Sequence, residues 1–410
     1  MPLLDGLGEV NWSALHHAYG PADDVPDLLR ALIDTENAPL SLRTAAKGAR
    51  RDVRDQVEWT LWGNVFHQGS RWQVTAGVVP FLVELLRDGP SDDRLRRFLI
   101  RYLHHLAIGY PEDVFPAVID PAEAFRAVDG MSDPGGEPDY DNHDLAAIWA
   151  RDSYLAVERA VDTIAPFMHA EDEDTALEAV ALVASFPRCA PTTVPLLRDV
   201  ARARPDQRAA HAVVSLAQLA PAEVLEDAER LVEADDRAVA IQAACAAVLA
   251  DPDRASAGAV ALLTAPVDDI AEAPSVHAGS LTQLIGRSLA RLADEHRERA
   301  IEALALQHRA ASPLERVSLT ASLLSLAFRG QAAPAAAADL TPPQKRAVEA
   351  IRDYGAFTVN GASFANYCLL VREWGLPASA DSLQSWLDGR DPIPRIASRG
   401  PWWRFWRPKE

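Results

Sequence analysis

The sequence has few cysteines and no long apolar run. Its three cysteines, Cys189, Cys245 and Cys368, are too few and too widely spaced for a disulfide framework or a Cys-based zinc site. No stretch of 18 uncharged apolar residues is present, so we expect no membrane-spanning segment. The first ten residues carry Asp5 and Glu9 and lack a basic region, which argues against a signal peptide. These absences predict a cytoplasmic protein.

Signatures of the common enzyme classes are also absent. The chain has no GxxxxGK, GxSxG or HExxH motif, and GLGEVN near the N-terminus has Asn11 where a dinucleotide-binding loop needs its third glycine. The run containing Asp139, Asp141 and Asp144 starts with the spacing of a calcium loop. It lacks glycine at the sixth position and has Ala150 where a bidentate glutamate belongs. We interpret it as a solvated loop, with weak cation binding as the alternative, and expect no catalytic residues, no metal and no cofactor.

Aromatic residues make up only 7% of the chain, whereas apolar residues make up 49% and alanine is abundant in the middle. This composition favours closely packed helices over sheets of β-branched residues, so the predicted fold class is all-α. The formal net charge of −19 argues against binding to nucleic acid or an anionic membrane. It suits a soluble protein or one that meets a basic partner.

Helical units recur along the chain. The stretch from Trp59 to Asp88 is interpreted as two amphipathic helices joined by a Gly-centred turn, with Pro80 near the start of the second. A hexamer with Leu at its second and fifth positions and Ala at its sixth recurs at 102–107, 215–220, 288–293 and 322–327, with weaker copies at 179–184 and 245–250. Apart from one longer gap, its copies lie 30 to 43 residues apart, a period typical of arrays of helix pairs.

The segments PFLVELL at 80–86 and PLLRDVA at 195–201 resemble the first helix of HEAT-like (armadillo-type) repeats of the divergent bacterial kind. The resemblance extends over residues 20–330. It implies an α-solenoid, a right-handed superhelix of antiparallel helix pairs, and it implies no particular activity because such arrays serve many roles.

The pattern divides the chain into four parts. Residues 1–330 form the predicted repeat array, which begins with a helical pair at 10–35 and is interrupted by an acidic, Gly- and Pro-containing loop at 129–144. Residues 331–340 are a linker, 341–394 a C-terminal helical cap, and 395–410 a basic aromatic tail. In the cap, Thr341 is the expected N-cap of a helix with Pro342 at its first position. Large apolar side chains would close the array there, namely Trp374, Leu376 and Trp386.

Three groups of residues are candidates for partner binding. On an expected helix over 40–62, interrupted at Gly48, four cations fall on one face, which is either a solvated face or a docking stripe for an acidic partner: Arg43, Lys47, Arg50 and Arg54. Trp62 and Trp72, with Trp59 and Phe66, are interpreted first as core packing and second as an aromatic binding patch. The acidic loop is the third group, because insertions in helical arrays often lie on the binding face.

The C-terminal tail is the most unusual local signal. Trp402, Trp403 and Trp406 alternate with basic residues, a composition suited to packing against the acidic protein, to an aromatic-lined partner groove or to a membrane interface. A membrane contact is therefore expected only through residues 399–410.

The sequence favours a non-catalytic protein-protein interaction scaffold or regulatory module, toxin neutralisation being one role that the resemblance allows. The alternatives are a HEAT-like enzyme of the DNA glycosylase or lyase type and a membrane-associated adaptor that uses the tail. A glycosylase needs a cationic channel for phosphates, which the net charge of −19 disfavours. No feature of the sequence specifies an oligomeric state.

Overall fold

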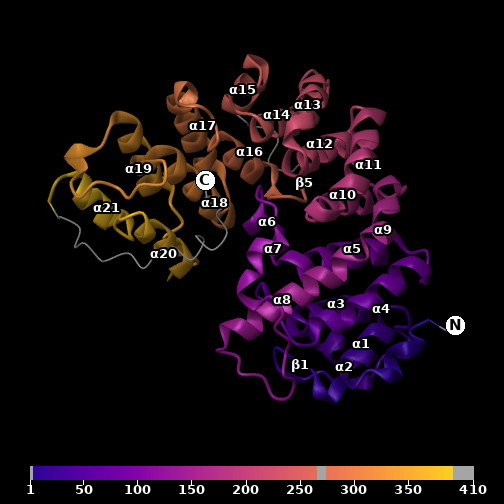
Figure 1. The fold of residues 1–410 in the computed structure, drawn as a ribbon. Coiled ribbons are helices and arrows are strands. Elements are labelled where there is room, and N and C mark those ends of the chain that lie inside the picture. Colours follow the sequence, from indigo (N-terminus) through magenta and orange to yellow (C-terminus); the bar gives the residue numbers. More distant parts are fainter. Residues whose placement is uncertain (1–2, 266–273, 391–410) are drawn as a thin grey trace. The chain divides into compact units, whose positions relative to one another are not determined.

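The computed structural model describes residues 3–265 and 274–390, which fall into two compact units (Figure 1). Unit 1 extends to Leu196 and unit 2 begins at Leu197, so the division lies within helix α11 (Ala190–Ala203). The protein is 66% helix and 4% strand, which confirms the all-α prediction in its coarse form. Residues 402–406, which hold the tail tryptophans, lie outside the described residues.

Unit 1 is built from short and medium helices and two β-hairpins. Its helices before α11 are α1 (Val25–Ala31), α2 (Leu40–Ala49), α3 (Val53–Asn64), α4 (Thr75–Asp88), α5 (Asp93–Ile108), α6 (Pro111–Val114), α7 (Pro121–Ala124), α8 (His143–Glu158), α9 (Val161–Ile164) and α10 (Glu173–Val183). Short 3-10 helices lie at Asp5–Glu9, Trp12–Ala14, Arg126–Val128, Ala165–His169 and Pro187–Cys189.

Helix α5 forms the centre of unit 1 and packs against α4, α8 and α10. It starts where the Asp92 carboxylate caps it by accepting hydrogen bonds from the backbone N–H groups of Arg94 and Leu95. Every residue from Tyr102 to Ile108 is buried, including both His104 and His105. Both are buried because neighbouring helices cover two sides of α5.

Four two-stranded antiparallel hairpins were not anticipated. They are β1–β2 (His16–His17 and Gly20–Pro21), β3–β4 (Phe66–His67 and Ser70–Arg71), β5–β6 (Pro274–Ser275 and Gly279–Ser280) and β7–β8 (Thr358–Val359 and Ala362–Ser363). In β3–β4 the two turn residues Gln68 and Gly69 both have positive φ, and in β7–β8 the same holds for Asn360 and Gly361. Two positive φ angles define the type I′ turn that suits the strand twist of a hairpin. Each hairpin comes shortly before a helix: α1, α4, α16 or α20.

The hairpins correct two expectations in unit 1. Residues 10–35 form a 3-10 turn, the hairpin β1–β2 and the single helix α1, instead of two helices. Between 59 and 88 the two helices α3 and α4 are joined by β3–β4, with Pro80 inside α4. The two hairpins lie side by side, since the backbone N–H of Val74 donates to His16 O and Tyr19 Oη lies 3.5 Å from His67 Nδ1. These contacts with distant residues hold the segments in extended form.

Unit 2 continues with longer helices and the other two hairpins. After α11, its helices are α12 (Gln207–Leu219), α13 (Leu225–Val232), α14 (Arg237–Ala250), α15 (Ala257–Thr264), α16 (Leu281–Leu289), α17 (Arg297–Ala310), α18 (Pro313–Phe328), α19 (Pro342–Tyr354), α20 (Ala365–Glu373) and α21 (Ala380–Leu387). Short 3-10 helices lie at Pro221–Glu223, Asp294–His296 and Ala337–Asp339. The alanine-rich α14 is almost fully buried and contacts α12, α13, α15 and α16, because its small side chains allow four helices to approach.

The C-terminal part of unit 2 contains the expected helix start and large buried side chains. A capping box links Thr341 and Gln344 at the start of α19, with Pro342 in the first turn, which confirms the predicted cap. Trp374, Leu376 and Trp386 are all buried. The segment 331–340, expected as a linker, has no longer element than the 3-10 helix Ala337–Asp339.

The acidic segment of unit 1 is a loop, as expected, and it is anchored. No helix or strand lies between Asp129 and Asn142. Trp149 Nε1 on α8 donates a 2.6 Å hydrogen bond to Asp133 Oδ2, and Arg151 donates to the backbone oxygens of Val128 and Met131. Most of the loop residues between these anchors and α8 are exposed.

Within the described ranges 3–265 and 274–390, no single helix is both long and apolar enough to cross a membrane. One bent pair, Glu173–Val183 with Pro187–Ala203, meets the length and composition criteria only when the two helices are taken together.

Candidate functional site

Helix α3 presents a stripe of acidic and aromatic side chains to a surface hollow. The helix begins after Asp52, whose carboxylate accepts a 2.7 Å hydrogen bond from the backbone N–H of Asp55. From there the side chains at spacings of three, four and seven residues share one face. Together with one preceding cation they line an open hollow of about 300 Å³: Arg51, Asp55, Glu58, Trp59 and Trp62.

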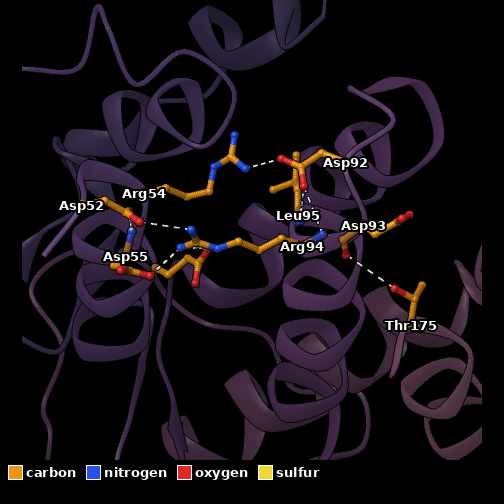
Figure 2. Close-up of polar contacts among 9 residues, drawn as sticks. Asp52, Arg54, Asp55, Asp92, Asp93, Arg94, Leu95 and Thr175 are labelled. Atoms are coloured by element: carbon orange, nitrogen blue, oxygen red, sulfur yellow. Dashed lines mark hydrogen bonds and ion pairs between the residues drawn. The ribbon is translucent and has the colours of Figure 1, made fainter. Parts of the chain in front are cut away.

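A network of ion pairs holds the acidic side of this hollow (Figure 2). Arg94, at the start of α5, reaches three carboxylates near the start of α3. Its Nη1 lies 3.1 Å from Asp52 Oδ2, and its Nη2 donates to Asp55 and lies 3.5 Å from Glu58 Oε1. Beside it, Arg54 pairs with Asp92 in the opposite direction, from α3 to the cap of α5. Ion pairs therefore link the N-terminal ends of the two helices in both directions, with an arginine from each helix.

The same end of α5 is tied to α10. Thr175 Oγ1 lies 3.5 Å from the backbone oxygen of Asp93 and 2.6 Å from Asp172 Oδ2, the carboxylate that caps α10 (Figure 2 shows the first contact). Arg97 of α5 also pairs with Asp174. The scaffold under the hollow is thus fixed by three helices.

Glu58 is the least satisfied carboxylate of the network. Its Oε1 is shielded from solvent and accepts no hydrogen bond within the described part of the protein. Burial raises the pKa of Glu58, and the charge of Arg94 acts against that rise. The Asp52 carboxyl behaves differently, because the hydrogen bond from the Asp55 backbone holds its pKa below the ordinary value. Glu58 also lines the hollow, so a cation that entered the hollow would meet this carboxyl group.

The aromatic side of the hollow combines one exposed and one packed tryptophan. Trp59 is 60% exposed, and the Arg51 guanidinium carbon lies 4.2 Å from the centre of its ring, a cation-π contact. Trp62 makes edge contacts with Phe66, Tyr102 and His105, so its ring is fixed by the interior of unit 1. The hollow therefore has a rigid inner wall and an exposed outer one.

An acidic, aromatic hollow of this kind can hold a cationic side chain. Carboxylates supply charge and hydrogen-bond acceptors, and tryptophan faces attract cations. The Arg51–Trp59 contact is one example of this geometry within the protein itself. The arrangement contains neither an activated nucleophile nor a poised acid-base pair.

The predicted stripe of four cations does not exist as one face. The expected helix over 40–62 is interrupted, because Arg50 adopts the left-handed conformation (φ 56°) after α2 and Asp52 caps a new helix. Arg43 and Lys47 are exposed on α2, Arg50 is exposed at the break, and Arg54 on α3 is half-buried against Asp92. Only Arg54 belongs to the network beside the hollow.

The other candidate residues lie elsewhere. Trp72 contacts Tyr140 and Trp149 rather than lining the hollow with Trp62. Asp139, Asp141 and Asp144 are exposed around the start of α8. Trp402, Trp403 and Trp406 lie outside the described residues.

Sequence reasoning missed most of the hollow. It identified Trp59 and Trp62 as part of an aromatic patch, but Arg51, Asp55, Glu58 and Arg94 were not selected. The available signal was the acidic series at 52, 55 and 58, which repeats every three residues at the start of a helix and includes an N-cap. Only the fold shows that Arg94 and Arg54 lie next to acidic side chains.

Within the described residues, no group of three or more His, Cys, Asp or Glu side chains is placed to hold a metal ion. No protein-family model matches the chain, and no curated protein matches it.

Proposed function

We propose that this protein is a non-catalytic protein-binding module, built as a HEAT-like right-handed superhelix of helix pairs, which holds a basic segment of a partner protein against α3. A regulatory role, toxin neutralisation included, is compatible with such a module. The helical content and the repeated Leu-Ala hexamers support the superhelical part of the proposal.

The observation that supports the binding role is the hollow of Asp55, Glu58, Trp59 and Trp62. An exposed tryptophan next to an under-satisfied carboxylate is a costly combination for a free surface, since large apolar rings and buried charge both lower stability or solubility. At an interface the same residues act as an anchor, because tryptophan is enriched among residues that dominate binding energy.

Charge complementarity indicates the chemistry of the partner. The protein carries a net charge of −19 and would attract a basic segment over a distance. In the hollow, an arginine or lysine side chain of that segment would lie against Trp59 and hydrogen-bond to Glu58. Arg51 would then exchange its contact with the ring for solvent.

The test compares the wild-type protein with Trp59→Ala and Glu58→Gln as immobilised baits in lysate of the native host, with quantitative mass spectrometry. Leu314→Ala and Glu36→Gln are matched controls, because both side chains are exposed and neither residue belongs to α3 or lines the hollow. We expect a basic protein that is retained by the wild type and by both controls. Trp59→Ala should weaken its binding by roughly 30-fold, the effect of losing one interface anchor.

Hydrogen exchange of the purified complex supplies a second readout, with slower exchange expected in α3 and the first turn of α5. Equal recovery of the same proteins by all five baits would refute the proposal. So would a bound partner that leaves exchange in α3 unchanged.

A further inference from the structure

Arg71 lies at the end of hairpin β3–β4 and folds back over its own turn. Its Nη1 donates a 2.8 Å hydrogen bond to the backbone oxygen of Gly69. This contact uses one edge of the guanidinium and fixes its orientation. Ring contacts place Tyr110 against Phe66 of the same hairpin, and Gly109 lies next to Arg71 Nη1.

No carboxylate accompanies this cation. Among the residues that the structure describes, Arg71 takes part in no ion pair, and its Nε is shielded from solvent without a hydrogen-bond partner. Burial lowers the pKa of Arg71 to about 10, and no neighbouring acid raises it again. Buried arginines are ordinarily paired, because removing a charge from water costs several kcal/mol.

The unpaired edge of Arg71 is the one that recognises oxyanions. With Nη1 committed to Gly69, the Nε–H and Nη2–H groups remain, and they point in parallel from the guanidinium. A carboxylate or phosphate binds such an edge through two parallel hydrogen bonds. Arg71 as a whole is half-buried, and its Nε is covered. An anion that forms both hydrogen bonds therefore displaces the atoms that cover Nε.

Two glycines allow close packing around the guanidinium. A Cβ at position 109 would lie 2.7 Å from Arg71 Nη1, and a Cβ at position 69 would lie 3.2 Å from the Tyr110 ring. Both glycines also have positive φ, which disfavours other residues. A side chain at either position would displace Arg71 or Tyr110.

We propose that Arg71 forms a binding site for a small oxyanion, a carboxylate or a phosphate group that offers two oxygens to the Nε and Nη2 edge. The ligand supplies the charge that the fold leaves unpaired. A polyanion such as nucleic acid does not fit this role, because the net charge of −19 repels it. The site is independent of the hollow on α3.

The first test is calorimetry and thermal unfolding of the whole protein in sodium phosphate, sodium acetate and sodium chloride at equal ionic strength. We expect heat of binding and a higher Tm with phosphate, acetate or both, compared with chloride. The anion that binds distinguishes the two ligand classes. Equal Tm in all three salts without heat of binding overturns the proposal.

Variants assign the effect to Arg71. Arg71→Lys keeps the charge but loses the two-pronged edge, so the anion should bind roughly tenfold more weakly or not at all. Arg87→Met is the control, because Arg87 is exposed and pairs with Asp88. An anion effect of the same size in Arg71→Lys as in wild type also overturns the proposal, since the anion then binds elsewhere.

A measurement on the wild type covers the case in which the variant does not fold. Labelling with an arginine-selective dicarbonyl reagent, read by peptide mass spectrometry, should be slowed at Arg71 by the bound anion and unchanged at Arg87. Equal rates at Arg71 with and without the anion contradict the proposal.

Discussion

The imidazole Nε2 of His104 lies 2.9 Å from the hydroxyl oxygen of Ser185, two residues that are 81 positions apart in the sequence. The contact joins the middle of α5 to the segment that follows α10. Burial and the neighbouring His105 lower the pKa of His104 to about 3, and burial lowers that of His105 to about 4. Both side chains are therefore neutral parts of the core.

These histidines predict a loss of stability in mild acid. Both have folded-state pKa values below the ordinary 6.5, so the unfolded chain binds more protons between pH 6.5 and 4. Their contribution is complete above pH 6.5 and falls as the pH decreases, by about 1.4 kcal/mol per histidine for each pH unit. Urea unfolding between pH 7.5 and 4.5 measures this slope.

Substitutions show which histidine causes this dependence of stability on pH. His104→Gln should lower stability at pH 7 through the altered packing, but its unfolding free energy should depend less steeply on pH. His143→Gln, at an exposed position, should leave the slope unchanged. Burial also lowers the pKa of His308 to about 4, so part of the pH dependence should remain in either variant. An unchanged slope in His104→Gln would show that this histidine does not contribute.

Arg94→Met should loosen the junction of α3 and α5. It removes the shared partner of Asp52, Asp55 and Glu58. Because Arg94 is partly exposed, the expected cost is about 1 kcal/mol in unfolding free energy, and it should shrink in high salt. The pKa of Glu58 should rise further, because in the wild type the charge of Arg94 opposes the effect of burial and the variant lacks that charge. NMR titration of the Glu58 carboxyl measures that rise, and a lower pKa would contradict it.

Gly69→Ala should destabilise the second hairpin. Gly69 has φ 86° in a type I′ turn, and the added methyl group would lie 3.2 Å from the Tyr110 ring. We expect a loss of about 1–3 kcal/mol, the range for strained backbone positions. Gly48→Ala is the matched control, because Gly48 lies inside α2 with no atom within 4 Å of the new Cβ. It should stabilise the protein by about 0.5–1 kcal/mol, since alanine favours helix. Thermal unfolding compares the two.

Asp133→Ala should release the acidic loop. The substitution removes the acceptor of the Trp149 Nε1 hydrogen bond, which fixes the loop on α8. Cleavage between residues 129 and 142 in limited proteolysis should become faster, while cleavage elsewhere stays the same. Asp141→Ala, an exposed change in the same loop, should cleave like the wild type.

The sequence predicted elements that depend on long apolar periods or on helix caps. The leucines at 82, 85 and 86 in α4 and the Thr341 cap of α19 are examples, and both are present. The hairpins were missed because each strand has only two residues, too few for an alternating pattern. Their signal was the recurring His-x-Gly-Ser at 67–70 and 277–280 and the Asn360-Gly361 pair, a turn signature.

The candidate site was less predictable than the fold. Trp62 was recognised as a large side chain at a helix end, but the hollow depends on Arg94, which is 32 residues further along the chain. The cation stripe failed at Arg50, whose left-handed backbone ends α2 two residues after Gly48. Pairing between distant charges is a property of the packed chain.

The hairpins also bear on how the chain acquires its structure. Each pairs residues only three to six positions apart and leads within a few residues into a helix. Contacts this local form on the microsecond scale, without the entropy cost of closing a long loop. We therefore expect each hairpin-helix junction to order early during synthesis, soon after its own residues have left the ribosome.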